Sequence, residues 1–185
     1  RGIPIFTFIN KMDRPTQDPL ALLDELEKVL GIRAFPVTWP LGNGADFRGV
    51  YDRLARQLFL FDKSVHGSHK PPFACGGPDD EALKAQVPAD VYDAWRGEVE
   101  MLSVAGEQFD TEQVLAGKIT PVFFGSALTN FGVQHLLDYF VRYGAPPVAR
   151  RTPNGPVAPE NPAFSGFVFK VQANMNPRHR DTVAF

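Results

Sequence analysis

The sequence has a single cysteine, Cys75, and no apolar run that approaches the roughly 20 residues of a membrane-spanning helix. One thiol excludes intramolecular disulfides and multi-cysteine metal sites, and it fits a reducing compartment. No signal peptide is visible. An excess of charge of one sign is also lacking, because 19 basic and 21 acidic residues leave a formal net charge of −2. This balance argues against a polybasic nucleic-acid arm, and we expect a cytoplasmic protein without a membrane partner.

Proline and phenylalanine, by contrast, are abundant, with 17 and 16 residues in a chain of 185. A hydrophobic content of 44% can supply a core of ordinary size, and the length suggests one domain, or one domain with part of another. The chain opens without Met, begins an apolar run at Ile3 and stops at Val183-Ala184-Phe185, which reads as the middle of a strand. We therefore expect a piece of a longer protein.

The predicted elements begin as strand, turn and helix, which is typical of an α/β unit. Residues 3–9 are short and apolar, as in a buried strand. Asp18 and Pro19 are favourable residues for a helix N-cap and first position, and Gly31 is expected to end that helix. Beyond it, the pattern predicts extended chain at 34–41, strands at 47–51 and 57–61, helices near 80–86, 89–107 and 111–116, a buried strand at 119–125, a helix at 131–143, a proline-rich linker at 144–162 and a strand at 164–171.

The most informative motif is Asn10-Lys11-Met12-Asp13, directly after the first buried strand. A guanine base presents N1–H and an exocyclic amine side by side, and one fixed carboxylate accepts from both. Adenine would leave that carboxylate unpaired, at a cost of about 1–3 kcal/mol. The Asn can bond the base and tie the loop to its neighbours, and the Lys stem can lie over the purine face. The turn falls at the carboxyl end of a strand, where open α/β sheets bind ligands; a plain polar turn is the alternative.

A second motif, Gly125-Ser126-Ala127-Leu128, directly follows the buried strand at 119–125. Small residues let the backbone approach a flat ring, and a backbone amide there can donate to the guanine carbonyl. Alone this motif is weak, because most Ser-Ala pairs lie in ordinary loops. On two strand ends together, the two motifs predict a guanine-nucleotide site.

These two motifs resemble the fourth and fifth signatures of the translational GTPases. The stretch from Phe8 to Arg14 is similar to both elongation factor G and the bacterial peptide chain release factor three family. The tail distinguishes them, because Phe167 and the stretch from Lys170 to Asp181 resemble the start of the second domain of release factor three. The resemblance covers essentially the whole chain.

The resemblance implies an α/β fold: the C-terminal half of a P-loop GTPase-type parallel sheet with an α+β insert, followed by the first strands of a β-barrel domain. The implied parts are 1–35, a portion of the G domain with the Asn-Lys-x-Asp motif; 36–110, the insert within the G domain; 111–145, the end of the G domain with the Gly-Ser-Ala motif; 146–163, a proline-rich linker; and 164–185, the start of the barrel.

The phosphate-binding half of such a GTPase is missing from this sequence. No G-x-x-x-x-G-K-[ST] loop occurs, because at Gly117-Lys118 the first Gly is replaced by Glu112 and the Ser or Thr by Ile119. Asp46-Phe47-Arg48-Gly49 matches the D-x-x-G pattern that holds magnesium and γ-phosphate. In the family that motif precedes the Asn-Lys-x-Asp strand, so we interpret this match as chance. No candidate remains for the switch threonine or the catalytic histidine.

By resemblance, the intact protein is a GTPase that binds GTP and GDP with Mg²⁺, acts on the ribosome in translation termination and promotes recycling of release factors one and two. The resemblance assigns base recognition to Asn10, Lys11, Asp13, Ser126 and Ala127, with Leu128 supporting the loop. It places no catalytic or metal-binding residue in this chain. Two alternatives stay open: a translocation GTPase like elongation factor G, and a non-catalytic binding module if no P-loop lies upstream. Because strand 3–9 would lack a neighbour, we also expect the chain to self-associate.

The other candidate residues are weaker. His66 and His69 lie in a loop without a third ligand, and Cys75 has no nearby base, so solvated histidines and an inert thiol are the better interpretations. His135 is expected to be a packing or surface residue. Arg150-Arg151 and Arg178-His179-Arg180 are candidates for contact with ribosomal RNA phosphate, although solvated loop charges explain them equally well.

The missing phosphate loop predicts that this chain neither hydrolyses GTP nor binds it tightly. Backbone amides, Lys and metal around the phosphates supply most of the stabilisation in phosphoryl transfer. Base contacts alone correspond to a dissociation constant in the millimolar range, about −4 kcal/mol. Titration with a fluorescent GDP analogue measures it, and sub-micromolar binding would contradict the prediction.

Overall fold

The structure is a computed structural model that describes residues 2–60, 73–74, 78, 81–84, 87–104, 108–175, 178 and 181–185. The candidates His66, His69 and Cys75 lie outside the described residues, as do His179 and Arg180 of the tail. Contacts divide the chain into two units, Arg1–Ala145 and Pro146–Phe185. Among the described residues, no helix combines the length and the apolar character needed to cross a membrane.

A parallel sheet with the strand order β1-β7-β2 lies at the centre of the first unit. Its middle strand β7 (Ile119–Phe124) is buried throughout and pairs with β1 (Thr7–Ile9) on one side and β2 (Arg33–Pro36) on the other. The strand predicted at 3–9 is shorter than expected, because only 7–9 pairs. Pro4 has no N–H to donate, and the Ile5 carbonyl accepts at 2.8 Å from the side-chain hydroxyl of Thr120 on β7.

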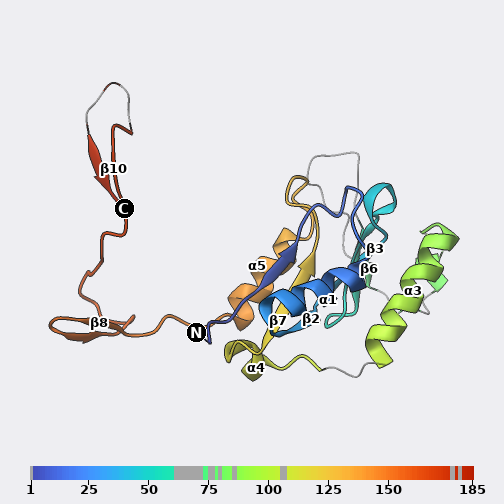
Figure 1. The fold of residues 1–185 in the computed structure, drawn as a ribbon, viewed down its shortest axis with the longest axis horizontal. Helices are drawn as coiled ribbons and strands as arrows, with labels where there is room; N and C mark the ends of the chain where they lie inside the picture. The colour runs from blue at the N-terminus through green and yellow to red at the C-terminus, as the bar shows by residue number, and fades with distance from the viewer. Residues whose placement is uncertain are drawn as a thin grey trace. The chain divides into compact units, whose positions relative to one another are not determined.

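Helices pack on both faces of this sheet (Figure 1). Side chains alternate along β7, so Val122 and Phe124 join one cluster with α1 (Pro19–Leu30). Phe123, between them, joins another with α4 (Thr111–Leu115) and α5 (Val133–Tyr143). The α/β class with a parallel sheet, predicted from the sequence, is therefore confirmed.

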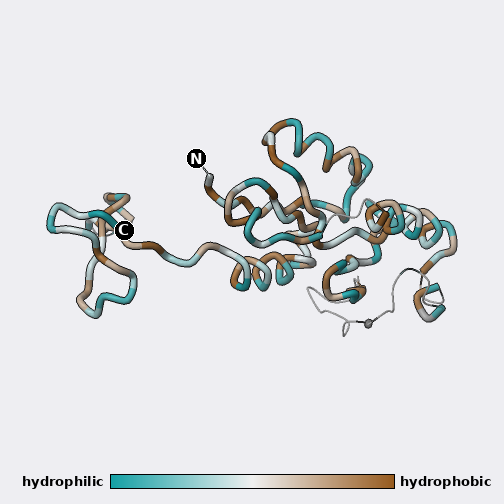
Figure 2. Tube along the Cα trace, turned by 90° about the horizontal axis from the view of Figure 1, so that it is seen from below, coloured by the Kyte–Doolittle hydropathy of each residue, from teal (hydrophilic) through white to brown (hydrophobic). Residues whose placement is uncertain are grey.

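The signals for the first helix act as predicted. The Asp18 carboxylate accepts hydrogen bonds from two backbone N–H groups of the first turn of α1, and Gly31 ends the helix in the left-handed conformation. Figure 2 shows helices in which hydrophilic and hydrophobic residues are interspersed along the coil, as expected for helices with one face on a core.

An antiparallel sheet with the order β3-β4-β5-β6 follows β2 directly. Its strands are β3 (Thr38–Leu41), β4 (Gly49–Asp52), β5 (Gln57–Leu60) and β6 (Phe73–Ala74). The helices of this segment are α2 (Glu81–Lys84) and α3 (Ala89–Val104). Trp95 of α3 packs edge-on against Tyr51 of β4, with ring centroids 5.4 Å apart. The Thr38 hydroxyl accepts from the Phe124 N–H at 2.9 Å, so this α+β segment is bonded to the central strand.

The D-x-x-G match has a structural explanation. Asp46 ends a short 3-10 helix, η1 (Gly44–Asp46), and Gly49 opens β4. A Cβ on Gly49 would lie 2.2 Å from the Phe59 carbonyl oxygen on the neighbouring strand, so glycine is required by strand packing. Strand packing is thus a reason for this glycine other than a phosphate site, and the interpretation of the match as chance stays a prediction.

The second unit differs from the sequence prediction in two places. Within the predicted linker, β8 (Arg150–Thr152) and β9 (Gly155–Val157) form a hairpin. The turn sequence Pro153-Asn154-Gly155 favours β-turns, and its proline suits a hairpin turn as well as a linker. The strand predicted at 164–171 is wrong, because β10 (Val171–Ala173) begins at its end and pairs with β11 (Thr182–Ala184). The described residues of this unit form two two-stranded sheets and no closed barrel.

Apolar surface stays uncovered beside β1. Among the described residues β1 has a single partner strand, β7. A hollow next to it is lined by Ile9, Leu22, Leu26 and Val29 together with Glu25, and Val29 is 75% exposed. An open strand edge beside an apolar surface is a template for pairing with another chain.

We therefore expect self-association through this surface. Val29→Lys places a charge in the hollow, which disfavours burial there, and should weaken association about tenfold, or ~1.4 kcal/mol. Val104→Lys is the matched control, because Val104 is 80% exposed at the end of α3. Sedimentation velocity over a concentration series measures the effect. An unsubstituted chain that stays monomeric throughout would refute the expectation.

Candidate functional site

The two predicted motifs leave the parallel sheet side by side. β1 and β7 are parallel neighbours, with Ile9 opposite Phe124 at their carboxyl ends. Oδ1 of Asn10 accepts hydrogen bonds from the Lys11 N–H at 2.7 Å and from the Ala127 N–H at 2.8 Å. One side-chain carbonyl thus joins two segments that are 117 positions apart. This is the loop-tying role that the sequence predicted for the Asn.

Met12 fixes the turn that carries the first motif. Its side chain is fully buried, its N–H donates to the Gly125 carbonyl at 3.0 Å, and its carbonyl accepts from the Gly44 N–H at 2.9 Å. Lys11, just before it, has a φ of +69°. This left-handed conformation costs a residue with a side chain about 1–2 kcal/mol. The bonds of Met12 hold the turn in that shape.

Asp13 and Lys11 carry charges that the described residues do not neutralise. Asp13 is partly buried as a residue, and its carboxylate forms no hydrogen bond or ion pair with any other residue in the described part of the chain. The same is true of the ammonium group of Lys11, which is exposed. A rigid turn therefore presents an acceptor and a cation two positions apart.

The loop after β7 presents backbone groups more than side chains. Ser126 and Phe131 exchange two backbone hydrogen bonds of 2.9 Å, which close the loop. The Ser126 hydroxyl is buried and has no hydrogen-bond partner among the described residues. Ala127 is exposed. The Leu128 side chain is 78% exposed, so the support predicted from this residue does not come from packing.

Gly125 is small for a different reason from the one the sequence suggested. A Cβ on Gly125 would lie 2.3 Å from the Phe131 carbonyl oxygen. The space that the sequence assigns to a ligand ring is therefore occupied by the backbone of Phe131.

These groups suit the edge of a planar base. A partly buried carboxylate can accept from adjacent donors, an aliphatic Lys stem can cover a ring face, and backbone N–H groups can donate to a carbonyl. Guanine offers the matching groups in one molecule, namely two adjacent donors, a flat ring face and a carbonyl, so the residues present fit it. Within the described ranges, no group of three or more His, Cys, Asp or Glu side chains is placed to hold a metal ion.

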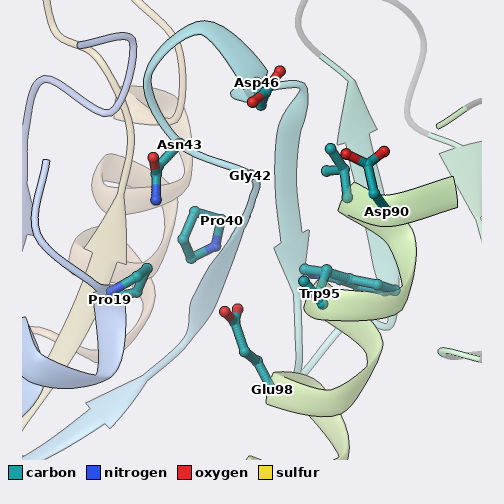
Figure 3. Close-up of a pocket in the computed structure, with 10 residues that line it drawn as sticks. Pro19, Pro40, Gly42, Asn43, Asp46, Asp90, Trp95 and Glu98 are labelled. Carbon is teal, nitrogen blue, oxygen red and sulfur yellow. The ribbon is translucent and has the colours of Figure 1, made fainter. Parts of the chain in front are cut away.

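A cleft of about 240 Å³ lies between α3 and the segment after β3 (Figure 3). Asn43 and Asp46 line it from one side and Asp90, Trp95 and Glu98 from the other. Glu98 accepts a hydrogen bond from the Trp39 indole at 2.8 Å. Burial raises the pKa of Glu98 and outweighs that bond, which acts in the opposite direction. None of the predicted site residues lines this cleft.

The remaining candidates are placed as follows. His135 is buried, and its ring lies edge-on to Phe59 with centroids 4.1 Å apart, so it is a packing residue. Arg150 and Arg151 are exposed on β8, and Arg178 is exposed too. The contacts of Gly44 and Phe131 with the two motifs were missed, because nothing in the spacing of these residues marks them.

A parallel sheet with two base-binding loops at one edge is typical of GTP-binding domains. The sequence profile of the elongation factor Tu GTP binding domain matches residues 1–146. The chain belongs to this family of GTP-binding domains of translation factors.

Closer similarity connects the chain to proteins named peptide chain release factor 3. Those of Gloeobacter violaceus, Synechococcus elongatus and Symbiobacterium thermophilum are 52%, 50% and 50% identical to it over all 185 residues. The match includes the tail, which we used to distinguish release factor three from elongation factor G, and the resemblance stated from the sequence is confirmed. The chain spans 35%, 33% and 35% of the lengths of these relatives, about a third.

Asn10→Ala should loosen the link between the two loops. The substitution removes the acceptor of the Ala127 N–H, whereas Asn10→Asp keeps an oxygen in the same place. We expect hydrogen exchange at the Ala127 amide to accelerate about 5- to 10-fold in Asn10→Ala, as for a bond worth ~1 kcal/mol, and to stay near native in Asn10→Asp. NMR-detected exchange measures both variants. Native exchange in Asn10→Ala would show that the bond does not hold the loops.

Proposed function

We propose that this chain supplies the guanine-reading part of a ribosome-associated GTP-binding protein of translation termination. The observation that carries the proposal is the 2.8 Å bond from the Ala127 amide to the Asn10 side chain, which brings both predicted base loops to one sheet edge. Family membership supports a guanine nucleotide as the ligand.

The pattern of donors and acceptors on guanine explains the choice of base. The Asp13 carboxylate accepts from N1–H and from the exocyclic amine, a charge-assisted pair. The Lys11 stem covers the purine face. Asn10 keeps its NH₂ for the base, because its oxygen is engaged by two backbone amides. The Ser126 and Ala127 N–H groups are engaged by the Phe131 carbonyl and by Asn10. The Leu128 N–H is therefore the backbone donor of this motif that we assign to the guanine carbonyl.

Hydrolysis of GTP is proposed for the full-length gene product. The sequence holds no phosphate-binding loop, so we expect GTP, GDP and Mg²⁺ to contact groups outside this chain at the phosphates. This chain would contribute base recognition and orientation, and alone it should be inactive.

The names of the relatives support a role in translation termination. We propose that the full-length product acts on the ribosome in the cytoplasm and promotes the recycling of release factors one and two. The exposed pair Arg150 and Arg151 is a candidate for contact with ribosomal RNA phosphate.

Asp13→Asn in the full-length product should shift preference from GDP toward xanthosine diphosphate. Xanthine has a carbonyl where guanine has its amine, and an amide side chain donates to that carbonyl while the native carboxylate repels it. GDP binding should weaken about 10- to 100-fold, as for a charge-assisted bond worth ~1.5–3 kcal/mol. Competition binding with the two nucleotides measures the shift.

Ser126→Ala is the comparison variant, and its effect on GDP affinity should be smaller because no charge is lost. A GDP preference that Asp13→Asn leaves unchanged would exclude Asp13 as the base reader. The gene sequence upstream of Arg1 gives a separate test. A P-loop there supports a GTPase, and its absence would favour a binding module without nucleotide chemistry.

A further inference from the structure

We propose that residues 42–47, here called the 42–47 loop, form a positioning element that orients Asp13 for guanine. The inference rests on the base-reading role proposed for Asp13. It assigns part of guanine specificity to Gly44 and Phe47, which lie outside both base motifs.

The 42–47 loop acts on Asp13 through the peptide group between Met12 and Asp13. Its carbonyl accepts from the Gly44 N–H at 2.9 Å. Because a peptide group is planar, this bond also fixes the Asp13 N–H and the direction in which the Asp13 Cα leaves the plane. The Met12 N–H is bonded to the Gly125 carbonyl at 3.0 Å. The residue before Asp13 is therefore held by the second motif and by the 42–47 loop together.

The other end of the loop contacts the second motif. The Phe47 ring is 1% exposed and lies edge-on to Phe131, with centroids 5.7 Å apart. Phe131 exchanges two backbone hydrogen bonds with Ser126. The loop therefore touches both base motifs, through Gly44 at the first and through Phe47 at the second.

Internal bonds make the 42–47 loop a unit. The Arg48 N–H donates to the Leu41 carbonyl at 2.9 Å and closes its ends. Within it, the Asp46 N–H donates to the Asn43 carbonyl at 3.0 Å. A displacement at one position is therefore transmitted along the loop.

Gly44 sits against the residues that directly follow the first motif, where a side chain would be tightly placed. Its φ is +56°, and a Cβ would lie 3.3 Å from the Pro15 nitrogen and 3.4 Å from the Pro15 Cα. Its neighbour Asn43 and nearby Asp46 border the cleft of Figure 3, so the loop has free volume beside it. A side chain at position 44 would move the loop into that volume and weaken the bond to Met12, with the core left in place.

The test compares the affinities of the full-length gene product for GDP and for inosine diphosphate, which lacks the exocyclic amine of guanine. The dissociation constant for inosine diphosphate divided by that for GDP gives a ratio that reports the bond between that amine and Asp13. We expect Gly44→Ala to lower this ratio about tenfold, as for a charge-assisted bond worth ~1.5 kcal/mol, while affinity for inosine diphosphate changes little.

Gly31→Ala is the matched control. Gly31 has a similar φ of +67°, and a Cβ there would meet nothing within 4 Å. The control carries the same backbone strain at the end of α1, away from the base loops, and should leave the ratio unchanged while lowering the melting temperature. If Gly44→Ala does not fold, Phe47→Leu tests the other end of the loop, and it should also lower the ratio.

The outcomes separate the two proposals. A native protein that does not distinguish GDP from inosine diphosphate would overturn the base-reading function itself. A native protein that distinguishes them, with an unchanged ratio in folded Gly44→Ala or Phe47→Leu, would overturn only the positioning role. An equal fall of the ratio in Gly31→Ala would also overturn it, because general strain would then explain the effect.

Discussion

Burial of β7 is the constraint on which the rest of the structure depends. All of Ile119–Phe124 is buried, so each backbone polar group of the strand needs a partner inside the protein. β1 and β2 bond its two edges. Past the end of β2, the Val37 N–H donates to the Val122 carbonyl and the Thr38 hydroxyl accepts from the Phe124 N–H. The antiparallel sheet thus begins at the end of β7 where backbone groups still need hydrogen-bond partners, and residues 37 and 38 supply them.

This arrangement makes the segment between the two motifs part of the site's support. The Tyr139 hydroxyl of α5 donates to both carboxylate oxygens of Asp52 at 3.0 Å. Burial and then the charge of Asp52 raise the pKa of Tyr139, which keeps the hydroxyl protonated and able to donate. Together with the bond between Gly44 and Met12, this contact ties the antiparallel sheet to the strand ends that carry the candidate site. Loops on such a support lose little further entropy when a ligand orders them.

Predictions from local chemistry succeeded where a residue acts on its own neighbours. Asp18 and Gly31 bound α1 because capping involves groups within one turn of the helix. The burial of β7 was predictable because a strand covered on both faces has a nearly continuous run of apolar residues. Errors arose where one composition permits two structures. A linker and a hairpin turn can both have the sequence Pro153-Asn154-Gly155, which here forms a hairpin. An apolar run such as 164–171 becomes a strand only where a neighbouring strand is available to bond it, and here pairing begins at Val171.

By itself, the sequence determined the α/β class, the positions of both motifs at strand ends and the type of base that their donors and acceptors suit, because each follows from residue chemistry at short range. Tertiary structure alone decided that Asn10 bonds Ala127, that Gly125 makes room for the Phe131 carbonyl, and that Gly44 holds the Met12 carbonyl. These contacts join residues far apart in the chain, and their geometry exists only after β1 and β3 have been placed against β7.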